Sequence, residues 1–212
     1  MSAPSNPIAI GALDLAALLC SRVCHDLISP VGAIVNGLEV LDEDKDEETK
    51  VFALDLIKKS AHQASAKLQF CRLAFGAAGS AGAQIDLGDA EKVARGLLGD
   101  DKTTIVWNLP RELMAKNRVK LLLNMLLIAV GTIPRGGTLT VDPTDGGKGF
   151  RIKASGLNAR LAEATPGLLV GSPDHPVDAH AIQPVYTGIL ARDCGLTATA
   201  VAEADGVVVS AV

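Results

Sequence analysis

Residues 18–41 decide the fold, and they read Leu-Leu-Cys-Ser-Arg-Val-Cys-His-Asp-Leu-Ile-Ser-Pro-Val-Gly-Ala-Ile-Val-Asn-Gly-Leu-Glu-Val-Leu. Apolar residues recur here at alternating steps of four and three, which is the heptad row of a helix that packs in a bundle. The row consists of Cys20, Cys24, Leu27, Val31, Ile34, Leu38 and Leu41. We expect a helix that begins near Leu13 and ends at the acidic run of residues 42–48.

A second helix is predicted from about Glu47 to Phe75, because the same steps of three and four continue there. Its row consists of Leu54, Ile57, Ala61, Ala64, Leu68, Cys71 and Phe75. Two heptad helices joined by a short polar turn form an antiparallel hairpin. One hairpin cannot bury all of its apolar surface, so a second copy would complete a four-helix bundle. We therefore predict a homodimer through the hairpin.

His25 falls one position off the first heptad row, so we expect its ring to be partly exposed while its neighbour Cys24 is buried. Pro30 lies inside the same helix and removes one backbone hydrogen bond, which predicts a kink in the turn that holds His25. The four cysteines have no zinc-binding spacing and are expected to be small buried side chains in a reducing compartment.

A second domain is predicted after residue 77, because a run of glycine, alanine and serine follows the hairpin and the periodicity then changes. The predicted division is a flexible N-terminus at 1–10, the hairpin at 11–77, a linker at 78–86 and an α/β sandwich at 87–212. Helices are expected at Leu87–Leu98, Arg118–Ile133, Ala159–Leu169 and Ala181–Asp193, and strands at Thr103–Asn108, Thr138–Val141, Phe150–Lys153, Leu196–Val201 and Gly206–Val212. The fold class is α+β, with the sandwich helices on one face of the sheet.

The composition of the 212 residues limits the function classes. Hydrophobic residues make up 48% and charged residues 21%, which is enough to bury a core. The net charge of −4 argues against a nucleic-acid partner. No signal peptide is recognisable, and the most apolar segment, residues 121–133, is too short to span a bilayer, so we expect a soluble cytoplasmic protein.

The order His25-Asp26-Leu27-Ile28-Ser29-Pro30 resembles the H-box of the histidine kinases, where a histidine and an acid precede a proline by a few residues. The predicted sandwich resembles the ATP-binding domain that follows the H-box hairpin in those kinases. The resemblance implies that His25 carries a phosphoryl group and that the rest of the chain supports, presents or regulates it.

The kinase pattern is broken where ATP would bind. Ile128 stands where the resemblance calls for the asparagine that holds magnesium, and an isoleucine offers no oxygen to a hard cation. The acid and the second glycine expected at residues 154–159 are absent, and residues 186–191 contain one glycine where several are expected. We therefore expect no ATP binding, so that His25 must receive its phosphoryl group from another protein.

A phosphoacceptor histidine combined with a degenerate ATP domain resembles the dimeric histidine phosphotransferases. The resemblance rests on residues 18–30, 33–39 and 73–77. It implies a phosphorelay in which a hybrid histidine kinase of the CckA type passes phosphate from its receiver domain to His25, and His25 passes it to response-regulator receivers of the CtrA and CpdR type. It also implies no cofactor of the chain's own, because the partner receiver brings magnesium.

Further site residues are proposed around His25. Asp26 either hydrogen-bonds the second ring nitrogen and fixes its tautomer, or faces a receiver. Lys67 is level with His25 when the turn is centred near residue 45, and it is either a cation that neutralises the phosphoryl group or a solvated surface lysine. Small and polar side chains on the His25 face form the predicted receiver-docking surface, which consists of Arg22, Ser29, Gly32, Ala33 and Asn36.

Two other functions fit parts of the sequence. An active histidine kinase would need ATP binding, against which the broken boxes argue. A scaffolding bundle without chemistry would make His25 an ordinary exposed histidine. Phosphate acceptance from a receiver, from ATP or from neither distinguishes the three.

Overall fold

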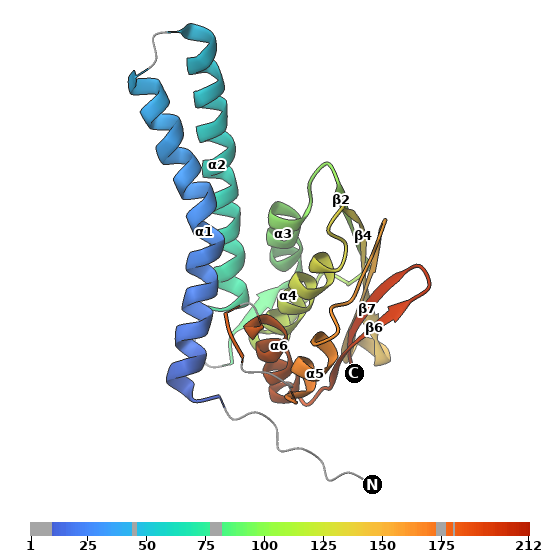
Figure 1. Cartoon of the computed structure of the whole chain (residues 1–212). Coiled ribbons are helices and arrows are strands. Elements are labelled where there is room, and N and C mark those ends of the chain that lie inside the picture. Colours follow the sequence, from blue (N-terminus) through green and yellow to red (C-terminus); the bar gives the residue numbers. More distant parts are fainter. Residues whose placement is uncertain (1–9, 44–45, 77–81, 173–176, 180) are drawn as a thin grey trace.

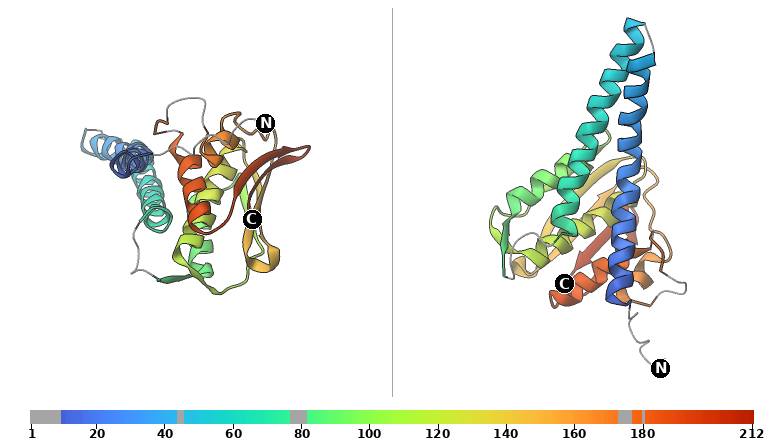
Figure 2. Two further views of the ribbon diagram at one scale, coloured as in Figure 1. Left: turned by 90° about the horizontal axis from the view of Figure 1, so that it is seen from below. Right: turned by 90° about the vertical axis from the view of Figure 1, so that its left-hand side faces the viewer.

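The computed structural model describes residues 10–43, 46–76, 82–172, 177–179 and 181–212, and the chain forms three layers (Figure 1). A long hairpin of α1 (Ala12–Glu43) and α2 (Glu47–Ala74) stands on one side. Helices α3 (Leu87–Leu98), α4 (Lys116–Gly131) and α6 (Ile182–Asp193) lie between the hairpin and a mixed sheet (Figure 2). The predicted fold class, a helical hairpin followed by an α/β sandwich, is confirmed.

The five-stranded sheet has the order β2-β4-β5-β7-β6, with β2 and β4 parallel and the other pairs antiparallel. Its strands are β2 (Thr103–Trp107), β4 (Gly137–Thr144), β5 (Gly149–Ser155), β6 (Ala198–Glu203) and β7 (Gly206–Ala211). The short turn η1 (Asp145–Gly147) joins β4 to β5, and both of its glycines have positive φ, which glycine adopts without steric cost.

The start of α2 follows from its sequence. Asp46 caps α2 by accepting a hydrogen bond from the Thr49 backbone N–H at 2.9 Å. This hydrogen bond and one from the Thr49 hydroxyl lower the pKa of the Asp46 carboxyl. Residues 44–45 of the predicted turn lie outside the described residues, and α1 continues through Pro30.

Each predicted heptad row splits into a half-buried and an exposed part. In α1, Leu27, Ile34 and Leu41 are half-buried, whereas Cys20, Cys24, Val31 and Leu38 are exposed. In α2, Ile57, Ala64 and Cys71 are at least half-buried, whereas Leu54, Ala61 and Leu68 are exposed. Two helices can cover only one side of each row. The prediction that Cys24 is buried is therefore wrong for the single chain. The prediction that all four cysteines are buried is also wrong, because Cys20 and Cys24 are exposed and Cys71 and Cys194 are only half-buried.

The lower end of the hairpin belongs to the core of the second domain. Phe70, Leu73 and Ala74 of α2 are buried in one cluster with the apolar residues of α4 and the inner face of the sheet. Nine residues of α4 are buried, whereas α1 has only Pro30 and Gly37 buried. The core thus fixes the base of the hairpin and leaves its upper part uncovered.

Two sequence predictions in the second domain fail. Residues 159–164 are not helical, and α5 spans only Thr165–Val170. Pro166 lies in its first turn, and a proline further inside a helix would clash with the preceding turn. The predicted linker 78–86 contains β1 (Gln84–Asp86), which pairs with β3 (Leu113–Ala115) in a separate two-stranded sheet. Strands of three residues are too short for their alternation to show in a sequence.

Candidate functional site

Helix α1 presents three faces, because its residues follow one another at about 100°. One face contains Pro30 and Gly37 and packs toward α2. A second face, roughly 120° away, is the exposed apolar row of Cys24, Ile28, Val31, Val35 and Leu38. The third face carries His25, whose side chain is 69% exposed. The histidine therefore lies on a solvent-facing polar surface, as its position off the heptad row predicted.

Asp26 lies between His25 and a cation. Its Oδ1 is 3.6 Å from His25 Nδ1, and its Oδ2 accepts a hydrogen bond from Arg22 Nε at 3.0 Å. At 3.6 Å the contact is longer than a hydrogen bond, so the carboxylate acts on the ring through its charge, while Arg22 holds the carboxylate one helical turn away. The role of Asp26 stays a prediction.

Lys67 satisfies a backbone group that Pro30 leaves without its helical partner. The carbonyl of residue 26 would normally accept from the N–H of residue 30, and proline has none. Lys67 Nζ donates to that Asp26 carbonyl at 2.6 Å from across the hairpin. The predicted register is therefore right. The bonded atom of Asp26 belongs to the backbone under the histidine, so Lys67 helps to hold the local geometry of α1.

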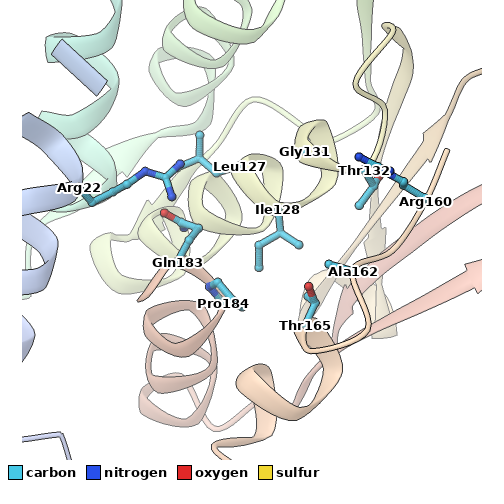
Figure 3. A pocket seen from close by; sticks show the side chains of 10 residues that line it. All are labelled: Arg22, Leu127, Ile128, Gly131, Thr132, Arg160, Ala162, Thr165, Gln183 and Pro184. Atoms are coloured by element: carbon cyan, nitrogen blue, oxygen red, sulfur yellow. The ribbon is translucent and has the colours of Figure 1, made fainter. Parts of the chain in front are cut away.

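Four of the five predicted docking residues lie on open helix surface. Ser29 and Asn36 are exposed, Ala33 is half-buried, and a Cβ added to Gly32 would meet no atom within 4 Å. Arg22 differs, because its side chain reaches toward α4 and α6 and is only 26% exposed (Figure 3).

Gly37, the other glycine of α1, faces α2 instead of open surface. A Cβ at Gly37 would come within 2.6 Å of Ile57 Cγ1 and 3.3 Å of the Ala53 carbonyl. Gly37 therefore allows α1 and α2 to approach each other closely.

A cavity of about 540 Å³ lies between α1, α4 and α6. Ile128 lines it in the place where the sequence lacks a magnesium ligand. Gly188 lies in the middle of α6, where an added Cβ would meet the Leu169 carbonyl of α5 at 1.9 Å. This glycine serves the packing of two helices. Among the described residues, no group of three His, Cys, Asp or Glu side chains could hold a metal ion.

Asn124 and Gln183 are buried polar residues that sequence reasoning missed. Asn124 Nδ2 donates to the Ala74 carbonyl at the end of α2 and to the Lys120 carbonyl, and Gln183 Nε2 donates to Asn124 Oδ1 at 2.7 Å. This chain ties the hairpin to α4 and α6. A polar residue inside an apolar helix was the one available signal, and its partners in α2 and α6 are 50 and 59 residues away in sequence.

Of the other three histidines, the described part of the chain includes one. His62 is exposed on α2, and His175 and His180 lie outside the described residues. Burial is the first cause that raises the pKa of the half-buried Cys71 thiol, and the nearby Asp26 charge adds to it. Cys71 is therefore a poor nucleophile, and His25 is the better candidate for covalent chemistry on the hairpin.

Comparison with known proteins gives a family for this arrangement. A family model described as the histidine phosphotransferase C-terminal domain matches residues 87–206, more than half of the chain. The protein belongs to the histidine phosphotransferase family. The protein phosphotransferase ChpT of Brucella abortus (strain 2308) is 51% identical over 210 residues, which cover 98% of this chain and 99% of ChpT.

The fold comparison agrees with this assignment. The 1.7 Å structure of a bacterial phosphotransferase superposes with a TM-score of 0.87 at 48% identity, over 98% of this chain and all of the other. The likeness spans both the hairpin and the sandwich. This chain is therefore an enzyme, a phosphotransferase of a phosphorelay, as the resemblance implied.

Helix α1 is also long and apolar enough to cross a membrane, by length and composition only. Core helices of soluble proteins pass the same test, but those helices are mostly buried. In α1 only 6% of the apolar window is buried within the chain. Arg22, His25 and Asp26 lie in its middle, where charges in lipid are costly. No membrane assignment follows.

Proposed function

We propose that His25 is the phosphoacceptor of a histidine phosphotransferase that shuttles phosphate between receiver domains. The observation that carries the proposal is the exposed His25 ring, with Nδ1 turned to Asp26 and Asp26 held by Arg22. A receiver must bring its aspartyl phosphate to within bonding distance of the ring, and an exposed histidine on a protruding helix permits that approach. The polar face of Ser29, Gly32, Ala33 and Asn36 is the proposed docking surface.

The transfer step needs no proton to leave the chain. The lone pair of His25 Nε2 attacks phosphorus, the N–P bond forms, and the P–O bond to the receiver's aspartate breaks with the electron pair on the carboxylate. The ring keeps its Nδ1 proton and becomes cationic, and the Asp26 carboxylate 3.6 Å away stabilises that charge. The reverse sequence on a second receiver releases the phosphoryl group. Lys67 acts by holding the Asp26 carbonyl in the turn that carries His25.

The proposed partners are a receiver domain of a hybrid histidine kinase of the CckA type as donor and receivers of the CtrA and CpdR type as acceptors. The enzyme needs no cofactor of its own, because the receiver supplies magnesium. We expect no ATP binding, because Ile128 lines the cavity where a magnesium-holding oxygen would be needed. The proposed compartment is the cytoplasm.

The proposed active form is a homodimer through the hairpin. The exposed side of α1 carries Ile28, Val31, Val35 and Leu38, each at least 48% exposed. An apolar row of this length, on a helix with two buried residues, is typical of a surface that another helix covers. A second hairpin would cover it and leave the His25 face open.

The test offers the purified protein a labelled phosphorylated receiver and, separately, labelled ATP with magnesium. Label from the receiver alone, lost in His25→Gln, is the expected result. Label from ATP would mean an active kinase. No label from either source, with CckA-, CtrA- and CpdR-type receivers tried, would mean a scaffold without chemistry.

A further inference from the structure

The cavity between the hairpin and the second domain has the size and lining of a small-molecule site. Its volume of about 540 Å³ lies in the range of pockets that hold small ligands. Ile128 and Pro184 form an apolar middle, and polar side chains stand around it (Figure 3). This mixture is typical of sites that hold an organic body and fix its polar ends.

Two arginines give the cavity a positive charge. Arg22 reaches it from α1, and Arg160 reaches it from the segment between β5 and α5 (Figure 3). No acidic side chain lines the cavity in the described part of the chain. Asp26 offsets the charge of Arg22 but accepts a hydrogen bond only from its Nε, which leaves the terminal nitrogens as donors, and no described residue forms an ion pair with Arg160. A ligand that complements this lining is an anion.

Gln183 supplies an independent sign of a missing ligand. It is 4% exposed and lines the cavity, and its Oε1 has no hydrogen-bond partner among the described residues. A buried acceptor without a donor destabilises a structure, so this atom favours a bound donor.

The orientation of the Gln183 amide is fixed by its neighbours. Asn124 Nδ2 donates to two carbonyls, so Asn124 Oδ1 must be the acceptor that faces Gln183. Gln183 Nε2 is therefore the group that donates to it, at 2.7 Å. Exchanging the two ends of the Gln183 amide would set two acceptors against each other. The unpartnered Oε1 is enclosed, with less than 1 Å² of accessible surface, so the Gln183 side chain must shift as a ligand enters for a ligand donor to reach it.

We propose that this cavity binds a small organic anion, a carboxylate or phosphate ester that also carries an O–H or N–H donor. The anion contacts Arg160 and Arg22, and the donor group bonds Gln183 Oε1. The site takes the ligand without magnesium, because Ile128 offers no metal ligand. Arg22 links the site to the histidine, because the same side chain holds Asp26 at 3.0 Å.

Competition for Arg22 gives the ligand a regulatory effect, which rests on the proposed role of His25. An anion that draws the Arg22 guanidinium into the cavity weakens its hold on Asp26. Asp26 then orients the His25 ring less well, so the bound anion slows phosphotransfer.

Binding is tested on the full chain by calorimetry and by NMR of the arginine Nε–H and glutamine side-chain signals. The probes are malate, its hydroxyl-free analogue succinate, glycerol 3-phosphate and inorganic phosphate, so that carboxylate and phosphate sources are separated. We expect malate to bind at least about tenfold more tightly than succinate, which lacks the hydroxyl, and glycerol 3-phosphate to bind more tightly than inorganic phosphate, which lacks the organic body. The tighter ligand of each pair should shift the Arg22 and Gln183 signals.

Variants locate the binding. Arg160→Gln is expected to weaken binding at least about tenfold, and Gln183→Leu to abolish the preference for a hydroxyl. Arg151→Gln removes an arginine of β5 that pairs with Glu203 and should change nothing. The absence of saturable binding for all four probes, or binding that Arg160→Gln leaves intact, would overturn the proposal.

The link to catalysis has its own readout. Saturating probe should slow phosphoryl transfer from a labelled receiver at least about threefold in the native chain. Unchanged transfer despite binding would refute the coupling through Arg22. Binding in a chain that accepts no phosphoryl group even without probe would instead refute the role of His25 and leave the site standing.

Discussion

The hairpin and the sandwich differ in how much of their apolar surface the single chain buries. Helix α4 has nine buried residues and packs between the hairpin and the sheet, whereas the longer α1 has two. The sandwich is complete within one chain. The hairpin keeps one apolar side and one polar side exposed, which is the arrangement needed by an element that binds a second copy with one face and receivers with another.

The largest effect is expected when the exposed apolar row of α1 is made polar. Replacing Val31 and Leu38 together by glutamate puts charges into the apolar row, so the proposed dimer should weaken at least about 100-fold. Sedimentation at micromolar concentration measures the change. Val201→Glu is the control, because Val201 is 57% exposed on β6 of the self-sufficient domain and should leave the assembly unchanged. A native chain that is monomeric at these concentrations would contradict the proposal that the exposed apolar row of α1 binds a second copy.

The joint between the two regions is expected to be the next most sensitive point. Asn124→Ala removes a buried amide that bonds Ala74 and Gln183, so unfolding should become easier by about 2–3 kcal/mol. Chemical denaturation measures this free energy. Asn117→Ala, an exposed position on the same helix, should cost much less. Equal losses in the two variants would show that the buried network does not join the regions.

The two glycines of the hairpin should respond with opposite signs. Gly32→Ala points into open space and gains helix propensity, so the hairpin should be stabilised by up to about 1 kcal/mol. Gly37→Ala forces a methyl group against Ile57 and should destabilise it by about 1–2 kcal/mol. Thermal unfolding of both variants gives the comparison. A stabilising Gly37→Ala would mean that the helices are farther apart than described.

The smallest effect is expected at Lys67, and Pro30 provides its control. Lys67→Met leaves the Asp26 carbonyl without a partner and should cost about 1 kcal/mol. Pro30→Ala restores the backbone N–H that bonds this carbonyl within the helix, so the cost of Lys67→Met should largely vanish in that background. A double-mutant cycle of unfolding free energies measures the coupling. Additive effects would separate Lys67 from the proline.

Sequence reasoning was strongest where a local pattern carries the information. The heptad steps predict both helices of the hairpin. Counting from the turn predicts that Lys67 is level with His25, and the hydrogen bond from Lys67 to the Asp26 carbonyl agrees with that register. It was weakest where contacts join distant residues. The heptad rows could not reveal that each row splits, because exposure depends on how many helices are present. Gln183 and Asn124 are 59 residues apart, and no local pattern announces their bond.

The central claim is that the exposed histidine of the incomplete region carries the phosphoryl group. The most direct measurement locates the acid-labile phosphoryl group by peptide mass spectrometry after the chain has reacted with a phosphorylated receiver. The account predicts the group on His25, its loss in His25→Gln, and its retention in His62→Gln, which changes the other described histidine of the hairpin. A phosphoryl group on His62, or one that persists in His25→Gln, would contradict the account.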